Sequence, residues 1–306
     1  MNYSWTIRNC LYRMKCFSFI PSKIEAKTVV FYMDPHRRYP GFVDILKAII
    51  GCYYIAKMNG YKFKIHYEVP FKLNKFLLPV DTLNNWQLSA SEKVDIDKLN
   101  ISTGLLNYYG VGKIPQLTKA RYQVRNFIGW NILQRNNVVD WEKKWHALYH
   151  ELFQPSDYLR KNIVEIGIKE NEYIAIHIRF VNALELAEPD FPQVPLNENE
   201  KEKLISTCIL KIKELESSEN CKAVVFSDSN YFLNRCREIE ISILEGNVGH
   251  VTYNQNAEIV LKMFTDLNMI ARAKKVFSFR SNNLYASAFP LYGSIIGGKL
   301  FKTISL

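Results

Sequence analysis

Short apolar runs alternate with longer amphipathic segments along most of this chain. This alternation is typical of βα units arranged around parallel sheets. In the first half, apolar residues recur in some segments at the spacing of a strand and in others at the spacing of a helix. Before residue 155 we predict a strand at 28–33, a helix at 43–58, a strand at 61–67, and helices at 118–133 and 141–153. The pattern between residues 70 and 114 is too weak to assign elements.

A second series of segments begins after Pro155-Ser156, which indicates a break followed by a new helix. Its predicted elements are a strand at 172–179, a helix at 198–217, strands at 221–227 and 249–253, a helix at 259–270, a strand at 275–279 and a helix at 282–289. Two such series predict an α/β fold, and 306 residues exceed the usual size of a single core. We therefore expect two domains that divide between residues 155 and 170.

Composition and charge narrow the class of ligand. Hydrophobic residues make up 48% of the chain and aromatic residues 13%, which favours packed globular structure over disorder. Forty Lys and Arg residues against thirty Asp and Glu residues give a net charge of +10, which favours anionic partners. These basic residues are spread along the sequence and form no arm. We therefore expect a small anionic ligand, with nucleic acid as a weaker alternative.

The cysteines and the apolar runs predict where the protein works. The six cysteines, at positions 10, 16, 52, 208, 221 and 236, include no CxxC pair, which favours a reducing compartment. Charges within the first thirty residues interrupt any apolar core of signal-peptide length. No apolar run approaches the roughly 20 residues needed to span a bilayer. We predict a cytoplasmic protein and leave open a peripheral contact with the inner membrane face.

The predicted strand at 172–179 ends in His177-Ile178-Arg179. Ligands of open α/β sheets bind at the carboxyl ends of the strands. Arg179 has a permanent charge and a planar fork of N–H donors that suits a phosphate, while His177 can donate or accept one proton. The alternative is a strand that ends in polar residues without a function. This segment alone does not decide between the two.

Polar residues also follow two later strands of the second series. Ser227-Asp228-Ser229 can cap the next helix or bind a ribose or the edge of a base. Ser278, Arg280, Ser281 and Asn282 lie where we predict a strand to end and a helix to begin. They can hold a phosphate at the helix N-terminus or only cap the helix. Three polar strand ends in one domain together predict a cleft for a nucleotide diphosphate.

The order of these motifs resembles that of the fucosyltransferase superfamily, which includes the α1,2-, α1,6- and protein O-fucosyltransferases. His177-Ile178-Arg179 resembles the family's His-x-Arg, and Ser227-Asp228-Ser229 and residues 278–281 resemble its later motifs. Residues 39–46 and 56–61 are similar to the first-domain loop and helix of the bacterial nodulation fucosyltransferases. The resemblance implies the glycosyltransferase B (GT-B) architecture, in which two Rossmann-like domains face each other across a cleft. Residues 1–160 would form the acceptor-side domain and residues 161–306 the domain that binds the nucleotide sugar.

The chain departs from the family directly after His-x-Arg. Many members continue with Arg-Gly-Asp, whereas Phe180-Val181-Asn182 stands here. We therefore expect the following loop to be built differently. Glu185, Glu188 or Asp190 can supply the carboxylate that the missing Asp would provide.

The resemblance also implies a chemistry, which is an inverting transfer of fucose from GDP-fucose without a metal or other cofactor. Negative charge grows on the leaving β-phosphate during such a transfer, and we predict that Arg179 stabilises it. Asp44 is the candidate base for the acceptor hydroxyl, or else an acidic residue that interacts only with the dipole of its helix. The one Asp-x-Asp triplet, Asp95-Ile96-Asp97, lies in a charged stretch outside the donor domain, so we assign no metal site.

Two other readings stay open. Recognition of a diphosphate does not identify the sugar, so the donor can be another nucleotide sugar. The chain can also be a non-catalytic protein that binds a nucleotide or a glycan. We expect a saccharide or glycolipid as the acceptor of an active enzyme, and His36, Arg37 and Arg38 precede Asp44 in a loop that can contact it.

Overall fold

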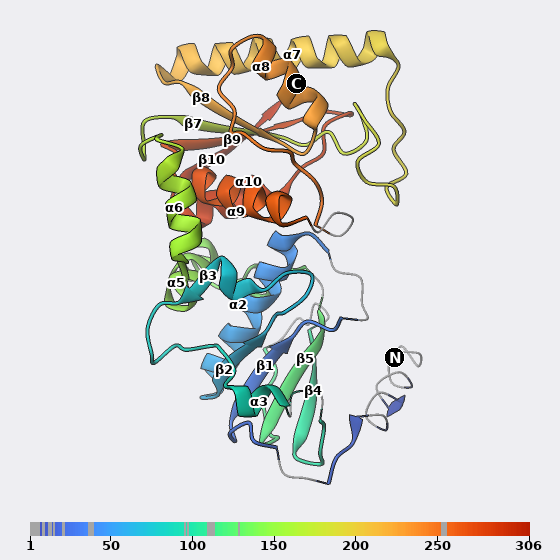
Figure 1. The fold of residues 1–306 in the computed structure, drawn as a ribbon, viewed down its shortest axis with the longest axis vertical. Helices are drawn as coiled ribbons and strands as arrows, with labels where there is room; N and C mark the ends of the chain where they lie inside the picture. The colour runs from blue at the N-terminus through green and yellow to red at the C-terminus, as the bar shows by residue number, and fades with distance from the viewer. Residues whose placement is uncertain are drawn as a thin grey trace.

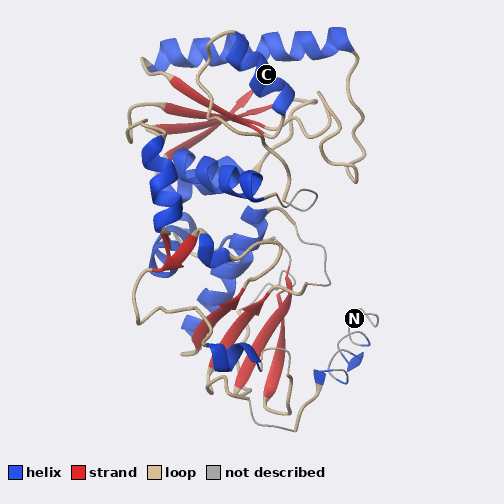
Figure 2. Cartoon of the chain, viewed as in Figure 1, coloured by secondary structure: helices blue, strands red, loops and turns tan. Residues whose placement is uncertain are grey.

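Two four-stranded parallel sheets, one in each half of the chain, form the framework of the protein (Figure 1). The computed structural model describes residues 7, 10, 11, 14, 16–19, 22–35, 40–94, 96, 98–108, 114–127, 129–251 and 256–306. Over much of this part helices and strands alternate, and helices cover the sheets in layers (Figure 2). None of the described helices combines the length and the apolar composition that crossing a membrane requires.

The sheet of the N-terminal half has the strand order β2-β1-β5-β4. Its strands are β1 (Thr28–Tyr32), β2 (Lys62–His66), β4 (Thr103–Tyr108) and β5 (Arg121–Phe127). Every residue of β1 is buried because a central strand of a parallel sheet is covered on both faces. Helix α2 (Phe42–Met58) follows β1 and buries most of its apolar residues against this sheet and its neighbours.

The sheet of the C-terminal half has the order β10-β9-β7-β8. Its strands are β7 (Ile174–Ile178), β8 (Ala223–Ser227), β9 (Lys275–Arg280) and β10 (Leu300–Ser305). Helices α7 (Glu198–Glu219) and α8 (Asn230–Glu238) cover the outer face. Helices α9 (Ala257–Arg272) and α10 (Ala288–Gly297) lie on the other face, between this sheet and the N-terminal half (Figure 1).

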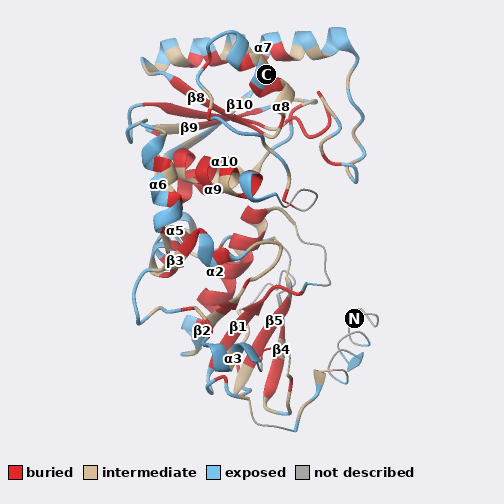
Figure 3. Ribbon diagram, in the orientation of Figure 1, coloured by how far each residue is buried: buried red, intermediate tan, exposed pale blue. Residues whose placement is uncertain are grey.

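Alternation along β7 decides which of its side chains face the N-terminal half. Ile174, Ile176 and Ile178 pack with the apolar residues of α7 and α8. Ala175 belongs instead to the core shared by α2, α9 and α10. Because side chains of a strand alternate between faces, His177 and Arg179 continue the side of Ala175. The burial pattern in Figure 3 shows the same arrangement, with buried strands under an exposed outer surface of α7.

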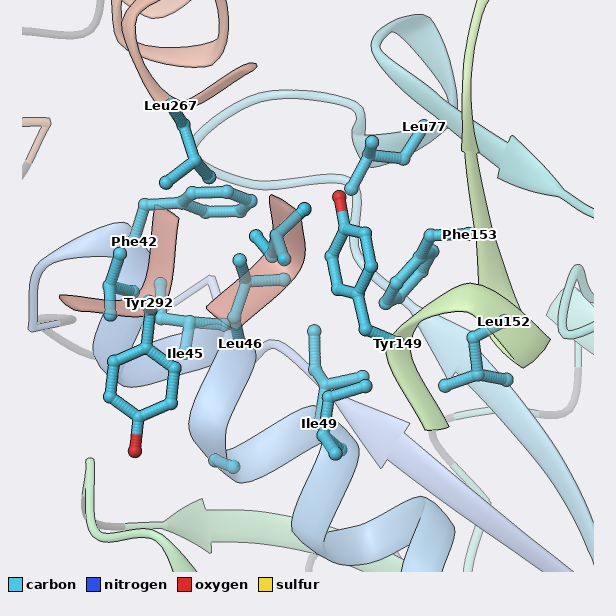
Figure 4. Packing of buried hydrophobic residues seen from close by; sticks show 14 of the residues in the cluster. Phe42, Ile45, Leu46, Ile49, Leu77, Tyr149, Leu152, Phe153, Leu267 and Tyr292 are labelled. Carbon is cyan, nitrogen blue, oxygen red and sulfur yellow. The ribbon is translucent and has the colours of Figure 1, made fainter. Parts of the chain in front are cut away.

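Aromatic and aliphatic side chains join the two halves. The Phe264 ring of α9 lies 4.6 Å from the Phe42 ring and 4.4 Å from the Phe76 ring, between centroids. Figure 4 shows residues of α2 packed against Leu267 and Tyr292 of the C-terminal helices. The smaller elements at this junction and in the N-terminal half are η1 (Leu73–Lys75), β3 (Leu77–Pro79), α3 (Ala90–Val94), α4 (Ile132–Arg135), α5 (Trp141–Leu152), β6 (Phe153–Pro155) and α6 (Asp157–Glu165).

Several predictions about elements are wrong. The helix predicted at 118–133 is strand β5 followed by the short α4, because the alternation from Tyr122 to Arg125 was too short to outweigh the helical spacing. Residues 249–251 form no strand, and residues 252 and 253 lie outside the described part. The helix predicted at 282–289 begins only at Ala288. Strand β10 was missed because it is a largely exposed edge strand without an apolar run.

The position of the predicted domain boundary can be compared with the elements. Residues 160 and 161 both lie inside α6, which begins after Ser156 as expected. The Ser156 hydroxyl caps this helix by accepting a hydrogen bond from the backbone N–H of Leu159 at 3.2 Å. The division into residues 1–160 and 161–306 stays a prediction.

Candidate functional site

A cavity of about 190 Å³ lies where the two halves meet. Its wall includes the carboxyl ends of β7 and β8, the start of α2, one side of α9 and the N-terminus of α10. This is the edge of a parallel sheet at which ligands bind in open α/β folds. The volume is below the roughly 300–1,000 Å³ of pockets that enclose drug-sized ligands, so a larger ligand would extend beyond it.

Arg179 lies at this wall, just beyond the end of β7. Its guanidinium donates to Glu188 at 2.7 Å, and its Nε lies 3.7 Å from a carboxylate oxygen of Asp228. The guanidinium carbon also lies 5.3 Å from the centroid of the Tyr285 ring. The side chain of Arg179 is 23% exposed and lines the cavity. The structure thus holds a fixed cation at the place predicted for a phosphate contact.

Asp228 holds the turn that follows β7. Its two carboxylate oxygens accept hydrogen bonds from the backbone N–H groups of Phe180 at 2.8 Å and Val181 at 2.9 Å. Burial raises the pKa of Asp228 to about 6, although these N–H donors and the charge of Arg179 act in the opposite direction. Val181 has a φ of 55°, which is unusual for a β-branched residue. Gly is the residue that adopts this conformation without strain.

Asn182 organises the loop that returns to Arg179. The residue is fully buried, and its amide nitrogen donates to the backbone carbonyls of Glu188, Phe191 and Gln193 at 2.9, 3.3 and 3.0 Å. Its amide oxygen accepts from the backbone N–H groups of Ala187 and Glu188 at 3.0 and 2.8 Å. A carboxylate cannot donate these bonds, so the loop depends on an amide side chain at this position. The loop delivers Glu188, one of the three proposed carboxylates, to Arg179.

His177 lies on the same face of β7 and is 6% exposed. Burial, and secondarily the charge of Arg179, lowers its pKa to about 3, so the ring is neutral at pH 7. Its Nδ1 atom is buried and has no hydrogen-bond partner among the described residues. The ring lies 5.7 Å from the ring of Phe289 at the start of α10, between centroids. A buried ring nitrogen without a partner at a cavity wall is suited to a ligand.

The N-terminal half contributes the segment from Gly41 to Asp44. Asp44 lies in the first turn of α2 and forms an ion pair with Lys47 of the next turn. A side chain at Gly129 would collide with Asp44, so Gly129 allows the close approach of that carboxylate. The predicted candidate base therefore lines the same cavity as Arg179 but comes from the N-terminal half, and its ion pair with Lys47 also fits a structural role.

Three charged or titratable residues at the cavity were not predicted from the sequence. His250 lies close to Gly41, since a Cβ on that glycine would stand 3.3 Å from its Nε2. Burial lowers the pKa of His250, while the charges of Glu188 and Asp44 act to raise it. Lys262 and Asp266 lie on the cavity side of α9. The signal that could have revealed Lys262 and Asp266 is a pair of polar residues, four positions apart, within the apolar face of a helix.

Five residues predicted to bind a nucleotide are not part of the cavity wall. Ser229 is the N-cap of α8, as the alternative of helix capping predicted. Its hydroxyl also donates to Glu185 at 2.9 Å. Ser278 is buried on β9 beside His177 in register, and Arg280 is exposed. Ser281 forms a tight turn with Leu284, and Asn282 is exposed in that turn. The N-cap of α10 is Ser287, a cavity residue that the sequence did not indicate.

Some predicted positions lie outside the described residues. They are Asp95 and Asp97 of the Asp-x-Asp triplet, and the loop residues His36, Arg37 and Arg38.

Comparisons with known proteins identify the architecture. No family model matches this chain, and no curated protein matches it significantly. Solved structures do match. A NodZ alpha-1,6-fucosyltransferase soaked with GDP-fucose has a TM-score of 0.55 and 13% identity, over 89% of this chain and 93% of its own. Fucosyltransferase NodZ from Bradyrhizobium has a TM-score of 0.57 and 12% identity, over 89% and 93%. A mutant of Arabidopsis thaliana FUT1 in complex with GDP has a TM-score of 0.59 and 11% identity, over 98% of this chain and 77% of its own.

This chain has a fucosyltransferase-like GT-B fold. The predicted α/β class and the resemblance to fucosyltransferases are confirmed at the level of the fold. In this GT-B fold the cavity lies between the two Rossmann-like halves, and both contribute residues to it. The roles assigned to individual residues stay predictions.

Proposed function

We propose that this chain is a metal-independent, inverting glycosyltransferase that transfers fucose from GDP-fucose to a saccharide or glycolipid acceptor. The observation that carries the proposal is the position of Arg179, a fixed cation at a cavity shared by the two halves of a GT-B fold. The structures with this fold include complexes described as containing GDP-fucose or GDP. The buried, unpartnered Nδ1 of His177 at the same wall also supports a ligand there.

In the proposed reaction, the bond between the anomeric carbon of fucose and the β-phosphate oxygen breaks. An oxygen of the acceptor forms the new bond from the opposite face, and the electron pair of the broken bond leaves with GDP. Negative charge on the leaving phosphate is stabilised by Arg179 and by the N-terminus of α10, whose dipole is positive at that end. His177 stays neutral at pH 7 and acts as a hydrogen-bonding group of fixed protonation.

The acceptor hydroxyl loses a proton in this reaction, and Asp44 is the proposed base. It lies on the half that faces Arg179, as an inverting transfer requires. Removal of one oxyanion-stabilising contact typically costs about 10²–10³ in rate, and a general base contributes about 10²–10⁴. Both residues together are thus able to supply a large part of the catalysis without a metal.

A non-catalytic nucleotide-binding protein of the same fold is the second candidate. The observation that favours it is that Arg179 is already paired with Glu188 and lies near Asp228. A paired guanidinium stabilises a leaving group less than a guanidinium whose donors are open to the ligand. Another nucleotide-sugar donor also stays a candidate, because contacts to phosphate do not identify the sugar.

Calorimetric titration tests these candidates directly. Purified protein is titrated with GDP, GDP-fucose, UDP and ADP, with and without EDTA, and release of GDP from GDP-fucose is then followed over time. Selective binding of GDP and GDP-fucose that EDTA does not change, with turnover, is the expected result. Preference for UDP would move the proposal to another donor, and binding without turnover would favour the non-catalytic candidate.

The proposal includes a place of action. The cysteine pattern favours a reducing cytoplasmic location, where GDP-fucose would be the donor. A glycolipid acceptor would bring the enzyme to the membrane surface as a peripheral protein. We propose no nucleic-acid partner, because the basic residues do not form an arm.

A further inference from the structure

Helix α9 carries a buried ion pair at the wall of the cavity. The Nζ of Lys262 lies 2.6 and 2.8 Å from the two carboxylate oxygens of Asp266, one helical turn away. The two side chains are 7% and 8% exposed, and both residues line the cavity. Of the described residues that line the cavity, two have a lysine or arginine side chain, namely Lys262 and Arg179.

Stability does not account for this pair. Taking two charges out of water commonly costs as much as their attraction returns, and apolar residues of similar volume are often at least as stable. Burial raises the pKa of Asp266 even against the nearby charge of Lys262, so desolvation is the larger effect here. Ile259 and Met263 line the same side of α9, so apolar residues would suit the neighbourhood of the pair.

The surroundings also fix the position of the lysine. Gly246 has a φ of 101°, and a Cβ there would stand 3.4 Å from Cδ of Lys262. The backbone at Gly246 therefore packs closely along the lysine stem. The ammonium has three N–H donors and lies within hydrogen-bond distance of two oxygens, both of Asp266.

The chemistry of the proposed donor requires a second cation. A nucleoside diphosphate sugar carries two negative charges on its phosphates, and Arg179 is already shared between Glu188 and Asp228. Arg280, the second cation expected from the sequence, is exposed and not part of the cavity wall. The wall does include the carboxylates of Asp44, Glu188, Asp228 and Asp266. An anionic ligand therefore needs every available donor at this site.

We propose that Lys262 is a second cation for the donor diphosphate and that Asp266 is the positioning residue that holds it when the site is empty. This inference rests on the proposed function. When the donor binds, the ammonium donates a hydrogen bond to a phosphate oxygen. It either keeps its ion pair with Asp266 or replaces that pair with the phosphate contact. The pair thus keeps a buried cation neutralised and oriented until the ligand arrives.

A double variant tests the inference without leaving a buried charge unpaired. In Lys262→Met/Asp266→Leu both charges are replaced by apolar side chains, so the fold is expected to be retained. Affinities for guanosine, GMP and GDP are measured by calorimetry. We expect about a 10- to 100-fold loss of affinity for GDP, the range of one hydrogen bond to a charged group, and little change for guanosine.

Two further variants serve as controls. Lys275→Met/Glu219→Leu likewise removes an ion pair, but Lys275 lies at the start of β9, away from the cavity, and pairs with Glu219 at 2.6 Å. It is expected to leave all three affinities within about twofold. Lys262→Arg keeps a cation beside Asp266 and is expected to retain most of the gain in affinity from guanosine to GDP.

The outcomes distinguish a failure of the proposed function from a failure of the role proposed for Lys262. If the unaltered protein binds no guanine nucleotide, the proposed function is wrong and the inference is wrong with it. The unaltered protein and the double variant can also bind GDP with the same affinity and gain the same affinity from guanosine to GDP. In that case the proposed function stands and Lys262 is only structural. A loss that is equal for guanosine and GDP would also overturn a phosphate contact.

Discussion

Strands β7 and β9 are neighbours in one sheet, and His177 is paired in register with Ser278, yet the two strands end differently. At the end of β7 the chain turns through Val181, is held by Asp228 and returns with Glu188 to Arg179. At the end of β9, Arg280 is exposed and the chain forms a surface turn before α10 begins. Polar residues of the same kinds follow both strands, but only those of β7 face the cavity.

The difference shows that the segment after a strand decides whether its last residues form a site. After β7, buried backbone N–H and carbonyl groups are satisfied by two polar side chains, Asp228 and Asn182. After β9, Ser281 and Leu284 satisfy each other's backbone groups in the turn. This turn still supports the site indirectly, because the N–H of Tyr285 donates to the backbone carbonyl of Arg179 at 2.9 Å.

The largest expected effect comes from Asn182→Asp. The carboxylate would face the three carbonyls that the amide now contacts, in a fully buried position. Uncompensated buried charges typically cost about 3–5 kcal/mol, which we expect as the loss of unfolding free energy in urea titrations. Asn282→Asp makes the same substitution in the exposed turn after β9 and should change stability by less than about 0.5 kcal/mol. Equal effects would remove the contrast between the two strand ends.

Arginine substitutions compare the two strand ends in function. Arg179→Ala should lower kcat/KM for GDP-fucose about 10²–10³-fold, because it removes a fixed cation from the developing charge on the phosphate. Arg280→Ala should stay within about twofold, since that side chain is exposed and away from the cavity. Initial rates of GDP release at several donor concentrations give kcat/KM for both variants. A comparable loss in Arg280→Ala would place the phosphate at the end of β9 instead.

His177 makes the stability of the β7 end depend on pH. In the folded protein its pKa is lowered to about 3, whereas an unfolded chain protonates this ring near pH 6.5. Below pH 6.5 the unfolded state therefore binds more protons, and the contribution of this residue to stability is lost as pH falls toward 3. The unfolding free energy of the unaltered protein, relative to His177→Leu, should fall by about 1.4 kcal/mol per pH unit in this range.

Ser278→Ala is the matched control for that measurement. It changes the register neighbour of His177 on β9 but removes no titrating group. Its unfolding free energy should run parallel to that of the unaltered protein between pH 7 and pH 4. A His177→Leu curve that is also parallel would mean that the ring has the same pKa in the folded protein as in the unfolded chain.

The smallest expected effect distinguishes the helix N-terminus from the turn before it. Ser287 caps α10 by accepting a hydrogen bond from the N–H of Phe289 at 3.2 Å, so Ser287→Ala should cost about 1 kcal/mol. Ser281→Ala, in the turn after β9, removes a hydrogen bond from the N–H of Asn283 at 3.2 Å but no helix cap, and should cost less than about 0.5 kcal/mol. Thermal or urea unfolding of the two variants measures the difference. A larger cost for Ser281 would favour the sequence-based position of the helix start.

Local patterns in the sequence were sufficient for much of the framework. The buried strands β1, β7 and β8 appear as apolar runs because parallel strands are covered on both faces. The residues directly after β7 and β8 were recognisable as site candidates, since the carboxyl ends of parallel strands meet at one edge. Edge strand β10 and the start of α10 were not, because exposed residues and a turn leave little local signal.

The sequence by itself thus determined the α/β class, the strands β1, β2, β7, β8 and β9 along the chain, and the positions of His177, Arg179 and Asp228 after or within them. Only the tertiary structure decided that His250, Lys262 and Asp266 belong to the same cavity, and that Arg280 does not. The physical reason is that sheet geometry brings neighbouring strand ends to one edge, whereas the segment after each strand decides whether its last residues reach the cavity. A loop residue or one side of a helix reaches the site only through packing between elements that are distant in the sequence, which no local pattern records.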